Sequence, residues 1–208
     1  MKVSLAALLM VAAAGCGSDS GSGSGDGGNG TGGDSFDVST ATLTDQPFCD
    51  TIDQETVATV LGISNSDVNL LVNREVGDKY EGPNDEGPPK TAEANLCSFG
   101  TSTKQFIVSV QPDATAKDVQ STVDDLSSLS GKGSSETCKP GDASPYGDPA
   151  GAFTCTSKPP TQRVRVVATG LVGNSKFYCS AILNEGAGPD FASAALDACR
   201  STLESLAD

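Results

Sequence analysis

Two arginines on one face of a predicted strand are the side chains best suited to bind a charged ligand. Arg163 and Arg165 fall two positions apart in the segment 162–169, and alternate residues of a strand share a face. Paired guanidinium groups can hold a carboxylate, a phosphate or a sugar acid through bidentate hydrogen bonds. Such a pair more commonly forms salt bridges with neighbouring acids, and the sequence leaves both interpretations open.

Tyr80 and Tyr146 are the candidate aromatic platforms. Each lies in an irregular stretch rich in glycine and proline, the first at residues 75–95 and the second at residues 132–151. If these stretches meet, the two rings would line a cleft for an apolar or glycan ligand. Long loops of this composition also occur as tolerated surface insertions, so a cleft is one of two alternatives.

Carboxylates offer the remaining enzymatic chemistry. The chain has no histidine, and so lacks the commonest general base and the commonest transition-metal ligand. Asp124 and Asp125 are adjacent acids, as are Asp85 and Glu86, but a hydrolytic pair must converge from different elements. We therefore predict a non-enzymatic domain with no cofactor and no metal. A carboxylate-based hydrolase of cell-wall polymer is the less favoured alternative.

The N-terminal segment carries the clearest chemical signature. One basic residue precedes an apolar run at residues 3–14, which is shorter than the roughly 18 residues of a membrane-spanning helix. Three small residues then directly precede Cys16, and this arrangement resembles the lipobox of bacterial lipoproteins. The resemblance implies that residues 1–15 are a signal peptide, that the chain is cut before Cys16, and that this cysteine is acylated.

A lipidated Cys16 would anchor the exported protein to the outer face of the cytoplasmic membrane. Residues 16–35 form the predicted tether, since nearly half of them are glycine and none after Cys16 is apolar. A linker of this composition is flexible and has a root-mean-square reach of roughly 25 Å.

The charge of the chain limits its partners. Lysine and arginine number 13 against 27 acids, which gives a net charge of −14. Nucleic-acid binding relies on clustered cations, and here the cations are scattered. The predicted partners are the membrane, through the lipid on Cys16, and an unknown small ligand or envelope protein.

Hydrophobic periodicity predicts one α+β domain at residues 36–208. The expected architecture is an antiparallel sheet of about five strands, with about three helices packed on one face. Asp53 is the expected N-cap of the first helix, and Gly62 ends it. Helices are predicted at 54–61, 115–129 and 190–206, a hairpin starts near residue 97, and further strands are predicted at 106–110, 152–156, 162–169 and 176–183.

Six cysteines remain after Cys16, and an even number in an exported chain predicts three disulfides. Their closest spacing is 17 residues, too wide for the Cys-x-x-Cys pairs of metal clusters. The predicted faces of the last strand and the last helix both turn a cysteine inward. The favoured pairings are Cys49 with Cys97, Cys138 with Cys155, and Cys179 with Cys199.

Two segments carry a family resemblance. Residues 48–62 read Phe-Cys-Asp-Thr-Ile-Asp-Gln-Glu-Thr-Val up to Leu-Gly, and residues 95–99 read Asn-Leu-Cys-Ser-Phe. They resemble actinobacterial lipoproteins of a domain-of-unknown-function family, in which a cysteine precedes a capped helix and a second cysteine opens a hairpin. The resemblance implies an envelope protein without assigned catalytic residues. The layout also resembles the extracellular sensor domains of actinobacterial kinases, which makes a sensor or inhibitor of a membrane protein an alternative.

Overall fold

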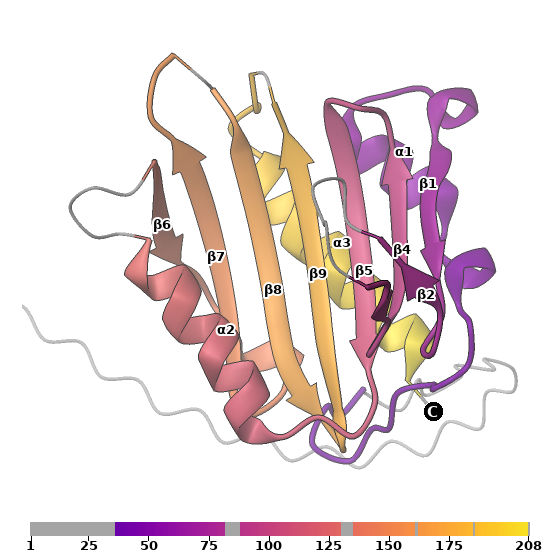
Figure 1. The fold of residues 1–208 in the computed structure, drawn as a ribbon. Coiled ribbons are helices and arrows are strands. Elements are labelled where there is room, and N and C mark those ends of the chain that lie inside the picture. The colour runs from indigo at the N-terminus through magenta and orange to yellow at the C-terminus, as the bar shows by residue number, and fades with distance from the viewer. Residues whose placement is uncertain (1–35, 82–87, 130–134, 161, 185, 208) are drawn as a thin grey trace, which may run out of the picture. The chain divides into compact units, whose positions relative to one another are not determined.

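The computed structural model describes residues 36–81, 88–129, 135–160, 162–184 and 186–207 (Figure 1). Backbone contacts divide the chain into Met1–Asp34 and Ser35–Asp208, and the second unit contains all of the described residues. The predicted signal peptide (1–15), the lipidation site Cys16 and the tether (16–35) lie outside them. Within the described ranges, no helix combines the length and apolar character that crossing a membrane requires.

A seven-stranded antiparallel sheet forms the centre of the domain. Its strand order is β1-β4-β5-β9-β8-β7-β6, and a separate pair of short strands, β2 and β3, lies beside it (Figure 1). The bounds are β1 (Asn69–Arg74), β2 (Lys79–Tyr80), β3 (Lys90–Thr91), β4 (Asn95–Gly100), β5 (Lys104–Gln111), β6 (Glu136–Pro140), β7 (Ala150–Ser157), β8 (Val164–Val172) and β9 (Ser175–Leu183).

The main sheet has two more strands than the roughly five that the sequence predicts. The additional strands, β1 and β6, lie at the two edges of the sheet. Each has a neighbour on one side only and is largely exposed, so neither shows an alternating apolar pattern. The α+β class and the central strands are as predicted.

The three α-helices lie on both faces of the sheet, so the prediction of a single covered face is wrong. α1 (Gln54–Leu61) and α3 (Phe191–Leu206) pack on one face, and α2 (Ala116–Ser128) packs on the other face over β6, β7 and β8 (Figure 1). The reason lies in β8, where the consecutive residues Val166 and Val167 are both buried and point to opposite faces. Helices must therefore pack on both faces of this strand to exclude water from these side chains.

The first helix has the predicted termini. The Asp53 carboxylate accepts hydrogen bonds from the backbone N–H groups of Glu55 and Thr56, which have no partner inside the helix. Gly62 ends the helix with a φ of 57°, a left-handed conformation that glycine adopts without strain.

All three predicted disulfide pairings are present. Cys49–Cys97 joins a short 3-10 helix (Cys49–Thr51) to β4, and Cys179–Cys199 joins β9 to α3. Cys138–Cys155 links directly opposed residues of β6 and β7. Closing loops of these lengths stabilises a domain by about 3–4 kcal/mol per disulfide in the chain-entropy model.

Candidate functional site

Arg165 lies on β8 and Arg163 directly precedes this strand, and Arg165 is engaged within the sheet. Its Nη2 donates to Oε2 of Glu136 on β6 at 2.8 Å, and the two side chains are only 19% and 14% exposed. This ion pair spans β7, which lies between the two strands. The Nε atoms of both arginines are buried and form no hydrogen bond with the described residues. The structure thus favours the salt-bridge interpretation for Arg165.

Tyr146 is a core residue, and the prediction that it lines a ligand cleft is wrong. Its ring is 2% exposed and stacks on Phe177 with the ring centroids 6.4 Å apart. Its hydroxyl donates to the backbone carbonyl of Leu196 at 2.8 Å. Burial, aided by the nearby Asp197 carboxylate, raises the pKa of the Tyr146 phenol. The irregular stretch around it forms a 3-10 helix (Ser144–Tyr146) that packs against β8 and turns the ring into the core.

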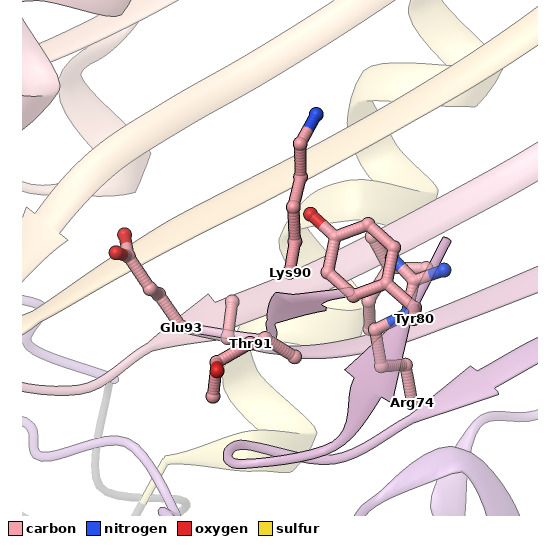
Figure 2. A pocket seen from close by; sticks show the side chains of 8 residues that line it. Arg74, Tyr80, Lys90, Thr91 and Glu93 are labelled. Carbon is pink, nitrogen blue, oxygen red and sulfur yellow. The ribbon is translucent and has the colours of Figure 1, made fainter. Parts of the chain in front are cut away.

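Tyr80, the other predicted platform, does line a pocket. The guanidinium carbon of Arg74, at the end of β1, lies 3.7 Å from the centroid of the Tyr80 ring on β2 (Figure 2). This distance is well within the range of a cation–π contact. Both side chains are half-buried, so the stacked pair remains accessible from the pocket.

The pocket beside this pair has a volume of about 540 Å³. Ligand-binding clefts commonly measure roughly 300–1,000 Å³, so the space suits a small molecule. Charged and polar side chains and small or aliphatic side chains both line it. The lining residues are Arg74, Tyr80, Lys90, Thr91, Ala92, Glu93, Ala94 and Leu96 (Figure 2).

Strand register positions the floor of the pocket. Arg74 on β1 pairs with Leu96 on β4, so their side chains share one face of the sheet. The turn between β1 and β2 is held against the link between β3 and β4, because the Gly77 N–H donates to the Ala92 carbonyl at 2.9 Å. The Ala92 N–H donates to the Asp78 carbonyl at 2.8 Å in return.

Buried Asn95 anchors the same region to the rest of the domain. Its Oδ1 accepts from the Val76 N–H at 2.9 Å, and its Nδ2 donates to the Asp45 carbonyl at 2.9 Å. One amide side chain therefore ties the turn after β1 to the N-terminal segment of the domain. This support holds the backbone that follows Arg74.

The described part of the pocket wall carries charges of both signs. Arg74 and Lys90 contribute two positive charges, and Glu93 contributes one negative charge. Figure 2 shows Lys90 next to Tyr80, with Glu93 on the other side. Among the described residues the Arg74 guanidinium contacts Tyr80 but forms no hydrogen bond or ion pair. Its N–H donors are thus available to a ligand.

Sequence reasoning identified Tyr80 but missed Arg74. The guanidinium is brought to the ring by β1, an edge strand that hydrophobic periodicity does not predict. A cation six residues before an aromatic side chain is too common a pattern to indicate a site.

The described acids do not form a convergent pair at this pocket or on α2. Asp124 and Asp125 are both exposed, and Asp124 accepts from Gln120 on the same helix. Asp85 and Glu86 lie outside the described residues. The carboxyl pKa values that clearly shift are all lowered, by hydrogen bonds from neighbouring hydroxyl and backbone N–H groups, at Asp37, Asp53, Asp118 and Asp142.

One cluster of metal-ligand types occurs in the described ranges, formed by Glu136, Cys138 and Cys155. The two sulfurs are bonded to each other as a disulfide, so neither is a thiolate ligand. The Glu136 carboxylate is occupied by Arg165. The cluster is therefore a structural junction of β6, β7 and β8.

Comparison of the sequence with protein-family models finds no match, and comparison with curated proteins finds no significant similarity.

Proposed function

We propose that this protein is an exported, lipid-anchored binding domain that holds a small ligand, without catalysis, in the pocket beside Arg74 and Tyr80. The observation that carries the binding role is the Arg74 guanidinium, which lies 3.7 Å from the Tyr80 ring centroid and has no ion-pair partner among the described residues. An oriented cation with free donors, in a cavity of about 540 Å³, is a ready receptor for a polar group.

The cysteines support the proposed location. Three disulfides persist in oxidising compartments and are rare in the reducing cytosol. The remaining cysteine, Cys16, follows the apolar segment and three small residues that resemble a lipobox. Export with acylation at Cys16 accounts for all seven cysteines of the chain.

The character of the pocket wall supports binding over catalysis. Its polar groups are two cations, a phenol, a hydroxyl and one carboxylate, and the chain has no histidine to act as a base. The Lys79 ammonium contacts the hydroxyl of Thr91. These groups suit the orientation of a ligand by hydrogen bonds and charge.

Fractionation of producing bacteria tests the proposed anchor. We expect the wild-type chain in the membrane fraction and in the detergent-rich phase, with the mass of an acylated N-terminal cysteine. The Cys16→Ala chain should lose the acyl mass and leave the detergent-rich phase. A wild-type protein that is unprocessed and soluble in the cytoplasm would contradict the proposal.

A ligand screen tests the proposed pocket. We expect compounds that raise the melting temperature of the wild-type protein to have no such effect on the Arg74→Gln and Tyr80→Ala variants. Arg200→Gln is the matched control, because Arg200 lies on α3 and pairs with Glu204. If the stabilising compounds act equally on all four proteins, the pocket is not the binding site.

A further inference from the structure

The Arg74 side chain is a receptor oriented for a planar anion. The Tyr80 ring restricts one face of the guanidinium, at 3.7 Å from its central carbon, and leaves the edge of the group for a ligand. Arginine presents its N–H donors in a rigid fork that matches the two oxygens of a carboxylate. Stacking on an aromatic ring lowers the conformational freedom that a ligand would otherwise have to remove.

The charge of the pocket sets the charge of its ligand. Arg74 forms no ion pair among the described residues, and the Glu93 carboxylate lies on the same wall. The whole chain carries a net charge of −14, and its field disfavours multiply charged anions. A single negative charge is therefore favoured over the two charges of a phosphate ester.

The part of the wall next to Arg74 is apolar. Ala92 is buried, Ala94 and Leu96 are half-buried, and Leu96 lies on β4 directly opposite Arg74 on β1. Small side chains here leave room for the body of a ligand, and its apolar surface would be removed from water against Leu96. An apolar surface therefore lies directly beside the Arg74 side chain.

We infer that the pocket binds a monocarboxylate with an apolar body. The carboxylate receives the Arg74 fork, and the body lies over Ala94 and Leu96. The inference rests on the proposed function of this pocket as the binding site, and it specifies the chemical class of the ligand. No bond is made or broken, so the ligand leaves unchanged.

The test is a titration of the isotope-labelled, detergent-solubilised mature protein, followed through its backbone amide NMR signals. Benzoate is the probe, benzamide is its neutral counterpart, and inorganic phosphate is the multiply charged one. We expect saturable shifts at Arg74, Tyr80 and Leu96 with benzoate, and association at least tenfold weaker with the other two probes.

Variants separate the guanidinium fork from simple charge. Arg74→Lys keeps the charge but loses the fork, and we expect it to lower benzoate association about tenfold, with a larger loss for Arg74→Gln. Tyr80→Ala removes the ring face that orients the guanidinium and should lower benzoate association about fivefold. Arg200→Gln, on the opposite face of the sheet, should bind as the wild type does.

The outcomes distinguish the ligand class from the binding role. If benzamide or phosphate shifts the same amides as strongly as benzoate, the pocket binds but the monocarboxylate inference is wrong. The inference also fails if benzoate association survives Arg74→Gln. If none of the three probes shifts these amides, the monocarboxylate inference is wrong, and the ligand screen alone decides whether the pocket is a binding site.

Discussion

Arg165 on β8 reaches across β7 to Glu136 on β6, with Nη2 2.8 Å from Oε2. Both side chains are more than four-fifths buried, and the Glu136 carboxylate compensates the Arg165 charge. The pair holds the short edge strand β6 at the side where the sheet ends. Arg165, which the sequence predicts as a candidate ligand contact, thus stabilises the sheet.

Loss of the Glu136 charge should destabilise the domain. Glu136→Gln leaves the Arg165 guanidinium without an anion in a mostly buried position, and we expect the free energy of unfolding to fall by about 1–3 kcal/mol. Urea denaturation of the oxidised protein measures this change in the free energy of unfolding. Glu204→Gln is the control, because its pair with Arg200 is exposed and should contribute no more than about 0.5 kcal/mol. Equal losses in the two variants would contradict the structural role.

Tyr146 and Leu196 provide a second test. Tyr146→Phe keeps the stack on Phe177 but removes the hydrogen bond to the Leu196 carbonyl, and we expect a loss of about 0.5–1.5 kcal/mol of unfolding free energy. Tyr80→Phe is the control, since the half-buried Tyr80 hydroxyl donates no hydrogen bond to the described residues, and the change should alter stability by less than about 0.5 kcal/mol.

The same phenol should make stability depend on alkaline pH. Burial raises the pKa of Tyr146 above its ordinary value near 10, so the folded state retains a proton that the unfolded state releases. The contribution is complete below the ordinary pKa and declines as the pH rises above it. Wild-type protein should therefore lose more stability than Tyr146→Phe between pH 9 and pH 11, as urea denaturation at each pH would show. Parallel pH profiles for the two proteins would contradict this assignment.

Central elements of the fold were predictable because one physical signal dominates each of them. In β9 the apolar residues alternate, and in α3 they recur at helical spacing, so both inward cysteines followed from periodicity. The apolar faces of β9 and α3 were sufficient to predict the Cys179–Cys199 pairing. For α1, local chemistry alone specifies the start at Asp53 and the end at Gly62.

The features that the sequence did not predict depend on contacts between segments that are distant in the sequence. Val166 and Val167 are consecutive buried residues of β8, and only the position of α2 shows that the second of them has its own cover. Tyr146 lies in a stretch with the composition of a surface loop, yet its ring enters the core beside Phe177. Arg74 reaches Tyr80 through the edge strand β1, for which the sequence pattern gives no periodic signal.

The Asp53 cap should stabilise the domain in a way that acid removes. Hydrogen bonds from Thr56 and from the Glu55 N–H lower the pKa of this carboxyl, so its contribution is present above the ordinary carboxyl pKa and is lost as the pH falls through the lowered value. We expect Asp53→Ala to cost about 1 kcal/mol at pH 7 and less at pH 2. Unfolding in urea at both pH values measures the difference. Asp190→Ala is the matched control, because Asp190 precedes α3 without a side-chain cap hydrogen bond.

Gly170 should not tolerate a side chain. A Cβ at this position would overlap the backbone carbonyl of Tyr146, because the 3-10 helix that carries Tyr146 packs directly on β8. We expect Gly170→Ala to destabilise the domain by about 1–3 kcal/mol, since backbone must move to make room. Gly188→Ala, where no atom lies within 4 Å of the added Cβ, should be close to neutral. Thermal unfolding of both variants in their oxidised forms makes the comparison. A Gly170→Ala protein as stable as Gly188→Ala would mean that Tyr146 does not pack as closely on β8 as the structure places it.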